Sequence, residues 1–415
     1  MKNKNEYKYY LNTALWHIVL MMINGSVMQA CMLEIGISAG NVSFFVSAMQ
    51  FVQVVIMMSI SKAAERIKKV IPIYAVACMA QVLILSVMLL MCSVNGINID
   101  MKYYIIFGVG VVTNIALGVS NVLAYKLPDH IMDMNRYGMV SGISGTVCGI
   151  IGIVFSSVLA YFLERYEYIP VIKIFYVTAI LFAVASTVVI ASFKDNGYEG
   201  KQNSKSDIKL FRYKPFTALI IPNLFRGFNS GAILLLLTIG YHIKIVDSVS
   251  AGYFVVITNA AMILSCVFYS YISKFNNDKW IIGISSCIIA VFLPIMCIGK
   301  STILFLAIYA VVYFAYNLIN YSVPVLVTKI VRYEIIGQYS AWRMLLHTLG
   351  GAMAGVLCIP MIDKLGVVPS LTIIGLMQLV SGGVYFIRAN KKKIMTVGTS
   401  DVSPLSHKSV YYIIS

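Results

Sequence analysis

Long apolar runs alternate with short polar breaks over almost the whole sequence. Each run holds about 20 to 25 residues, the length of helix that crosses a hydrocarbon layer of ~30 Å. The pattern therefore predicts an all-α membrane protein with about 12 transmembrane helices. The expected spans are residues 10–34, 41–61, 70–94, 102–125, 138–163, 169–193, 216–241, 250–273, 280–299, 301–327, 338–362 and 366–388.

Composition agrees with this pattern. Of 415 residues, 60% are apolar and 12% are charged, and the mean hydropathy is +0.85. An ordinary soluble domain has roughly twice that fraction of charged residues, so a soluble globular protein is excluded. The eight cysteines lie in apolar runs without the spacing of a zinc site, so we expect them to be packing residues that form neither disulfides nor a metal site. We also expect no cofactor.

The net charge of +16 reflects the positions of the basic residues rather than a nucleic-acid partner. With the N-terminus inside, 24 of the 32 Lys and Arg residues fall in cytoplasmic segments. Positively charged short loops stay on the cytoplasmic side. The sequence thus predicts a multi-pass protein of a bacterial cytoplasmic (inner) membrane, in contact with lipid, with both termini cytoplasmic.

The two halves of the chain resemble each other. Residues Thr13–Leu15 recur as Thr217–Leu219 at an offset of 204, and Ser38–Gly40 recur as Ser250–Gly252 at an offset of 212. Six spans in each repeat is an even number, so the two repeats run in the same direction. The expected division is a first half at 1–193, a linker at 194–215, a second half at 216–388 and a tail at 389–415.

The loop after the second span carries a family motif. Residues Ser61–Val70 occupy the place of G-x-x-x-D-R-x-G-R-R in the major facilitator superfamily, with Glu65 and Arg66 at the acidic and basic positions. Together with the parallel repeats, this loop makes the chain resemble that superfamily over nearly its full length. The resemblance implies the MFS fold, with Glu65 and Arg66 as a cytoplasmic latch between the halves.

Glycines form a stripe along the fifth expected span. They recur at intervals of four and three residues, which places them on one helix face, and small residues let membrane helices approach closely. A shorter equivalent in the eleventh span contains Gly351 and Gly355. We expect these faces to pack the halves together. The residues of the longer stripe are Gly138, Gly142, Gly145, Gly149 and Gly152.

The resemblance also implies a central cavity lined by spans 1, 4, 7 and 10, each of which has an asparagine near its centre. Arg226 lies about 15 Å deep at ~1.5 Å per residue, and His347 is similarly deep. Such groups need a polar partner, water or a ligand within the membrane. The candidate substrate-binding residues are Asn24, Asn114, Arg226, Asn229, Asn317, Asn320 and His347.

No Asp or Glu lies at mid-depth in the expected spans, and the helix-5 signature of drug antiporters is missing. We therefore expect a monomeric secondary transporter for a small anionic, zwitterionic or polyhydroxyl solute, working by alternating access, with a proton or ion as the coupling partner where transport is coupled. A multidrug exporter and a lipid-linked oligosaccharide flippase are the alternatives. The histidines lack the context of a hydrolase motif, so we do not expect an enzyme.

Overall fold

In the segments that it describes, the computed structural model consists of helices and the short turns between them. These segments are residues 2–23, 25–64, 67, 69–94, 96–124, 127–132, 134–195, 214–272, 277–299, 301–330 and 333–390, and side chains are further left out at 2–3, 61–64, 129, 134–139, 141–142, 214–219, 328–330, 333–341 and 388–390. Most of the expected linker and tail, and the expected latch of Glu65 and Arg66, lie outside the described residues.

The helices follow the expected spans closely. Within the described segments, eleven helices are long and apolar enough to cross a membrane, or twelve if one bent pair counts as a span. Their bounds are α1 (Lys2–Ile23), α2 (Ser26–Glu34), α3 (Ala39–Ala64), α4 (Val70–Ser93), α5 (Ile99–Ala124), α6 (Leu127–Ile131), α7 (Met134–Arg165), α8 (Tyr168–Ala191), α9 (Lys214–Leu234), α10 (Leu236–His242), η2 (Ser248–Ser250), α11 (Ala251–Ile272), α12 (Asp278–Ile295), α13 (Thr302–Ile330), α14 (Tyr333–Leu365) and α15 (Val367–Asn390).

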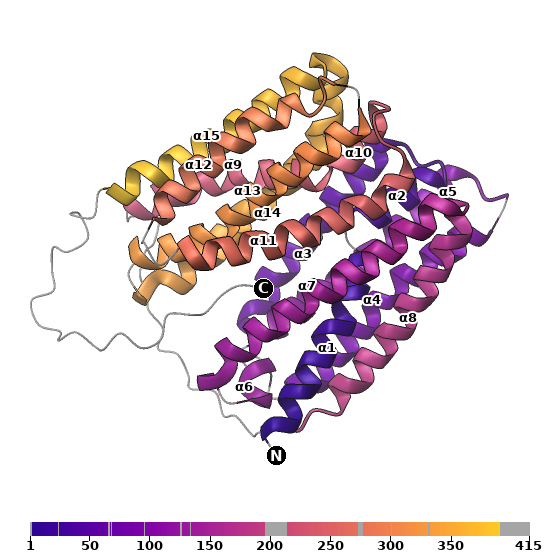
Figure 1. Ribbon diagram of the computed structural model, residues 1–415. Coiled ribbons are helices and arrows are strands. Elements are labelled where there is room, and N and C mark those ends of the chain that lie inside the picture. The colour runs from indigo at the N-terminus through magenta and orange to yellow at the C-terminus, as the bar shows by residue number, and fades with distance from the viewer. Residues whose placement is uncertain are drawn as a thin grey trace, which may run out of the picture.

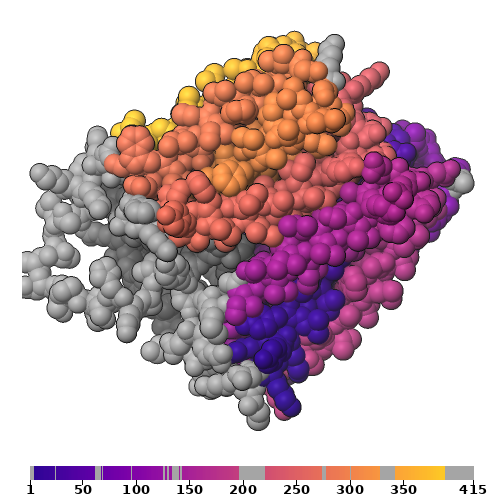
Figure 2. Space-filling view, viewed as in Figure 1, coloured from indigo at the N-terminus to yellow at the C-terminus, as the bar shows by residue number. Residues whose placement is uncertain are grey.

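Two bundles lie side by side (Figure 1). We call α1–α8 the first half and α9–α15 the second half. Each half packs mostly within itself, through pairs such as α4 with α5 and α9 with α14. Two helix pairs form the main contact between the halves: α3 packs on α14, and α7 packs on α11. Figure 2 shows the second of these contacts at the surface, where the purple α7 meets the salmon α11.

The first expected span corresponds to one candidate span, Lys4–Glu34, in which the helix is interrupted. α1 ends at Ile23 and α2 begins at Ser26, with Gly25 between them at φ 92°. Glycine adopts this left-handed conformation without steric cost, whereas other residues rarely do. The seventh span is broken too, because α9 and α10 meet at 56° around Leu235. The first break lies at the short polar stretch Asn24–Ser26 and the second in apolar sequence. Neither contains a proline, and both are too short to interrupt the hydropathy of their spans.

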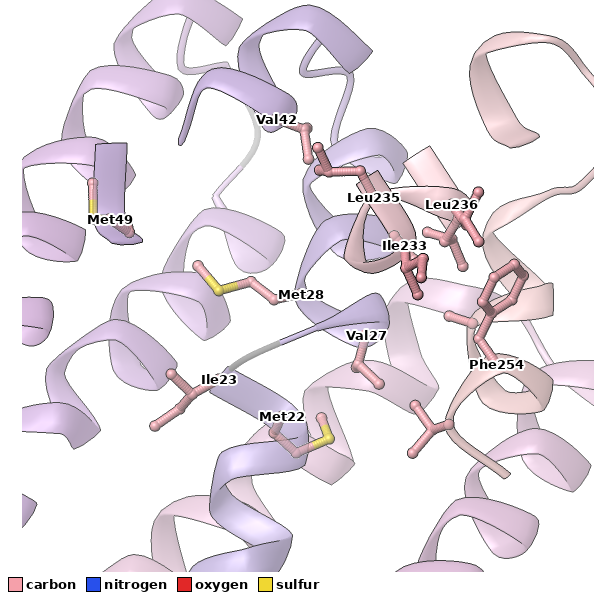
Figure 3. Packing of buried hydrophobic residues seen from close by; sticks show 14 of the residues in the cluster. Met22, Ile23, Val27, Met28, Val42, Met49, Ile233, Leu235, Leu236 and Phe254 are labelled. Carbon is pink, nitrogen blue, oxygen red and sulfur yellow. The ribbon is translucent and has the colours of Figure 1, made fainter. Parts of the chain in front are cut away.

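The breaks lie within a common apolar core. Figure 3 shows Met22 and Ile23 before the first break, Val27 after it, and Leu235 and Leu236 at the second. All five of these side chains are buried. This packing holds the short helices α2 and α10 in place even though each is separated from its longer neighbour.

Among the described residues, the hydrogen bonds between the halves lie mostly toward one end of the molecule. We call the end where α1 begins the amino end, and the end where α2 terminates and α10 lies the distal end (Figure 1). Gln29 of α2 donates to the Leu234 carbonyl at 3.0 Å and accepts from Thr238 at 2.7 Å. Ser248 donates to Glu34 at 2.5 Å. The distal end therefore joins the halves through α2, α10 and η2.

Candidate functional site

Arg226 lies in the middle of α9 and is buried, with 6% of its surface exposed. Its Nη2 donates to the Asn320 Oδ1 of α13 at 2.5 Å. A guanidinium inside a membrane bundle requires polar partners, and the amide of Asn320 provides one. The structure thus brings together two of the candidate residues from neighbouring helices.

His347 of α14 lies near two arginines, Arg226 of α9 and Arg343 of its own helix. Gly227, the neighbour of Arg226 in sequence, packs directly against the backbone carbonyl of His347. Among the described residues, His347 Nε2 and Arg343 Nε have no hydrogen-bond partner. The centre of the second half is therefore a site of concentrated positive charge and available donors.

Two further candidate asparagines are buried in the same helices, Asn229 in α9 and Asn317 in α13. Asn229 is fully buried, and neither atom of its amide finds a hydrogen-bond partner in the described part of the chain. Asn317 is 8% exposed, and its Nδ2 has no partner there either. Buried polar groups are nearly always hydrogen-bonded in proteins, so unpaired amides indicate groups that a ligand or water would satisfy.

The candidate residues of the first half behave differently. Asn114 of α5 donates to the Gly110 carbonyl one turn earlier at 2.9 Å, so its donor is satisfied within its own helix. Asn24 lies outside the described residues. Among the described candidate asparagines, Asn114 is thus paired within its own helix, whereas the amide of Asn229 and the Nδ2 of Asn317 have no hydrogen-bond partner in the described structure.

The glycine stripes lie at the contacts between the halves. A Cβ on Gly149 would meet Ile263 of α11 at 2.8 Å, and one on Gly355 would meet the Ser43 carbonyl of α3 at 2.7 Å. A Cβ on Gly145 would meet nothing within 4 Å, and the contacts of Gly138 and Gly142 fall outside the described side chains. In the described part of the longer stripe, the close approach is therefore at Gly149 and Gly152, and Gly145 lies in open space.

Several polar pairs between the helices are not predicted from the sequence. Ser230 and Tyr316 share a hydrogen bond of 2.6 Å between α9 and α13, one turn from Arg226. His17 and Asn259 lie 3.2 Å apart and join the two halves. A Cβ on Gly152 would meet both His17 and Asn259, so this glycine leaves the space that their contact occupies. A lone polar residue in an apolar run gives no sign of its partner.

A separate cavity of about 620 Å³ lies at the distal end. Its walls come from the turn between α2 and α3 and from the segment between α10 and η2. Tyr241, Lys244 and Asp247 are among its polar lining residues. The cavity is distinct from the polar cluster around Arg226, because none of its lining residues belongs to that cluster.

The comparisons with known proteins agree on the architecture. The chain is similar to the D-xylose-proton symporter, with a TM-score of 0.71 and 12% identity over 95% of this chain and 99% of that one. It is also similar to the nucleoside transporter NupG (TM-score 0.63, 14% identity, 93% and 98% covered) and to a bacterial homologue of the iron transporter ferroportin in an inward-facing state (0.68, 12%, 94% and 99%). No curated protein matches the sequence.

A family model identifies the chain more directly than these distant structures do. The model of the Major Facilitator Superfamily matches residues 10–355, which is most of the sequence. This match agrees with the two helical halves, with the spans and with the solved structures of similar fold. The protein belongs to the Major Facilitator Superfamily.

Proposed function

We propose that the protein is a secondary transporter that moves a small polar solute across a bacterial cytoplasmic membrane by alternating access. The observation that supports this most is the polar cluster of the second half. Arg226, Asn320, Asn229 and His347 lie in helices that are otherwise apolar. Keeping such groups in a membrane bundle costs free energy, and binding a solute there offsets that cost.

The chemistry of the cluster favours an anionic, zwitterionic or polyhydroxyl solute. Arg226 and Arg343 supply positive charge, while Asn229, Asn317 and Asn320 offer amide groups. Arginine binds carboxylates and phosphates through two parallel hydrogen bonds, and amides pair with hydroxyl groups. The similar proteins named as a xylose and a nucleoside transporter carry solutes rich in hydroxyl groups.

The distribution of contacts supports alternating access. The halves are hydrogen-bonded from the level of His17 and Asn259 to the distal end, where Gln29 and Glu34 reach the second half. In our proposal, the distal end faces outward and these bonds close it. Breaking them while new contacts form at the amino end would open the site to the other side. Glu65 and Arg66 are the proposed latch there.

His347 is the proposed proton carrier if transport is coupled. Imidazole exchanges protons near neutral pH in water, and the Nε2 of this ring has no hydrogen-bond partner in the described structure. In the apo bundle, burial and the charges of Arg226 and Arg343 oppose a proton on the ring. Protonation of His347 would add a positive charge beside the two arginines. Binding of a negatively charged solute would then favour uptake of the proton, which couples the two events.

The test begins with thermal stability. Purified protein is heated with a panel of metabolites, and we expect a polar solute to raise the melting temperature, because ligands that bind the folded state stabilise it. The Arg226→Ala variant should lose this shift, whereas Thr178→Ala, on an exposed part of α8, should keep it. Flux of the same solute into proteoliposomes then measures transport. Flux equal to that of empty vesicles for every stabilising solute would contradict the proposal.

A further inference from the structure

Two cysteines of the first half lie in contact near the distal end. The Sγ atoms of Cys31 in α2 and Cys92 in α4 are 3.3 Å apart. Both side chains are buried, Cys31 completely and Cys92 with 8% exposed. The two thiols come from separate helices and are 61 residues apart in sequence. Their contact therefore brings two reactive groups together at a place where spans 1 and 3 otherwise need only apolar packing.

The pair is set apart from the other buried cysteines. All eight cysteines are free thiols, and Cys78, Cys297 and Cys358 are buried too. In the described structure, only Cys31 and Cys92 share a hydrogen-bond contact between sulfur atoms. A disulfide has an S–S length of about 2.05 Å, so the sulfurs need to approach by only about 1.3 Å from their 3.3 Å separation. A small adjustment of α2 suffices.

α2 is the element best able to make that adjustment. It is nine residues long and is separated from α1 at Gly25. It also carries Gln29 and Glu34, which bind the second half. α2 is thus a short segment of the first half that is held by hydrogen bonds to the second half. A covalent bond from Cys31 to α4 would fix it to the first half instead.

We propose that Cys31 and Cys92 form a reversible disulfide that fixes α2 to α4. The oxidant is a disulfide compound, either a small molecule or a protein. Cys92 lies at the end of α4, with Lys102 and Lys173 within electrostatic range. Its thiolate attacks one sulfur of the oxidant and releases one thiol.

The Cys31 thiolate then attacks the mixed disulfide at the sulfur of Cys92 and releases the second thiol. Two cysteine thiols and one oxidant disulfide thus become one protein disulfide and two product thiols. Two electrons pass from the protein to the oxidant. Reduction by an excess of thiol reverses both steps and returns α2 to its unlinked state.

The first experiment detects the bond. The full-length protein is treated with oxidised glutathione or with dithiothreitol, unfolded, alkylated with N-ethylmaleimide and digested for mass spectrometry. We expect oxidation to remove two alkylatable thiols and to give a linked peptide pair containing Cys31 and Cys92, reversed by dithiothreitol. Cys78→Ser should keep this result, and Cys92→Ser should lose it. Full alkylation of both cysteines after oxidation, or pairing of Cys31 with another cysteine, would overturn the proposal.

The second experiment measures what the bond does to α2. Hydrogen–deuterium exchange of residues 26–34 should be slower in the oxidised protein than in the reduced protein, because the link suppresses local opening. Oxidant should change nothing in Cys92→Ser. Equal exchange in the oxidised and reduced wild-type protein would show that the disulfide does not fix α2. Neither measurement requires a transported solute, so both are independent of the proposed transport function.

Discussion

The helix pairs α9–α14 and α1–α7 occupy related places in the two halves but differ in packing and chemistry. In α9–α14, Gly227 lets the backbone of α9 touch the carbonyl of His347, and Arg226 lies beside this contact. In α1–α7, Thr13 and Ser144 share a hydrogen bond of 2.5 Å, and a Cβ on Gly145 would meet nothing. One helix pair is thus closely packed beside the buried charge of Arg226, and the other is joined at this level by neutral side chains beside an open glycine.

This difference indicates that the two halves have different roles in binding the solute. Both halves contain bonded neutral pairs, such as Gln81 with Ser120 at 2.9 Å in the first and Gln378 with Ser286 at 3.0 Å in the second. In the described part of the first half, the buried polar atoms without a partner belong to uncharged side chains, namely those of Gln81, Tyr103, Thr113 and Tyr176. The second half keeps buried amide groups of Asn229 without partners among the described residues. We infer that the second half recognises the solute through its cationic and amide groups, while the first half supplies a complementary wall.

The largest effect on stability is expected when the close packing of α9 on α14 is disturbed. In Gly227→Ala, the added methyl group would overlap the His347 carbonyl, which is backbone and cannot turn aside. We expect a loss of about 3 kcal/mol in the free energy of unfolding, in the range for overpacked cores. Thermal unfolding in detergent measures it. Gly145→Ala, in the open place of the first half, should leave the melting temperature unchanged or raise it, and an equal loss in both variants would remove the contrast.

The next largest effect is expected on solute affinity when the charge of Arg226 is removed. Arg226→Ala should lower the affinity for a stabilising solute by about 30-fold, because a hydrogen bond to a charged group contributes about 2 kcal/mol. Equilibrium binding by calorimetry measures this change. Arg226→Lys keeps the charge but loses the planar fork, so its loss should be intermediate. Unchanged affinity in Arg226→Ala would exclude this residue from the binding site.

A smaller effect is expected when the hydrogen bonds from Gln29 of the first half to the second half are removed. Gln29→Ala removes the hydrogen bonds to the Leu234 carbonyl and to Thr238. Each such bond contributes about 1 kcal/mol, so α10 should open more often. Hydrogen–deuterium exchange of residues 236–242 should become faster, with Ser59→Ala on the exposed side of α3 as the control. Unchanged exchange would mean that Gln29 does not restrain the second break.

The smallest effect is expected from the asparagine of the first half. Asn114 already donates to the Gly110 carbonyl of its own helix. We therefore expect Asn114→Ala to change solute affinity by less than about 3-fold, which is under 1 kcal/mol. The same calorimetric measurement applies. A loss as large as that of Arg226→Ala would show that both halves recognise the solute equally.

The sequence predicts the spans well because hydrocarbon thickness sets a strict minimum length for an apolar run. It does not predict the breaks at Gly25 and Leu235, since these depend on local backbone angles and on partners such as Gln29 from distant sequence. The depth of Arg226 is visible in the sequence, but its bond to Asn320 is not. Depth follows from counting residues, whereas pairing depends on how helices rotate against each other.

The most direct test of the second half as the recognising half is the structure of the protein with a stabilising solute bound. Cryo-electron microscopy of the complex would locate the solute among the helices. We predict hydrogen-bond contact with Arg226 or Asn320, together with at least one amide of Asn229 or Asn317. A solute bound only by side chains of α1–α8 would contradict this account.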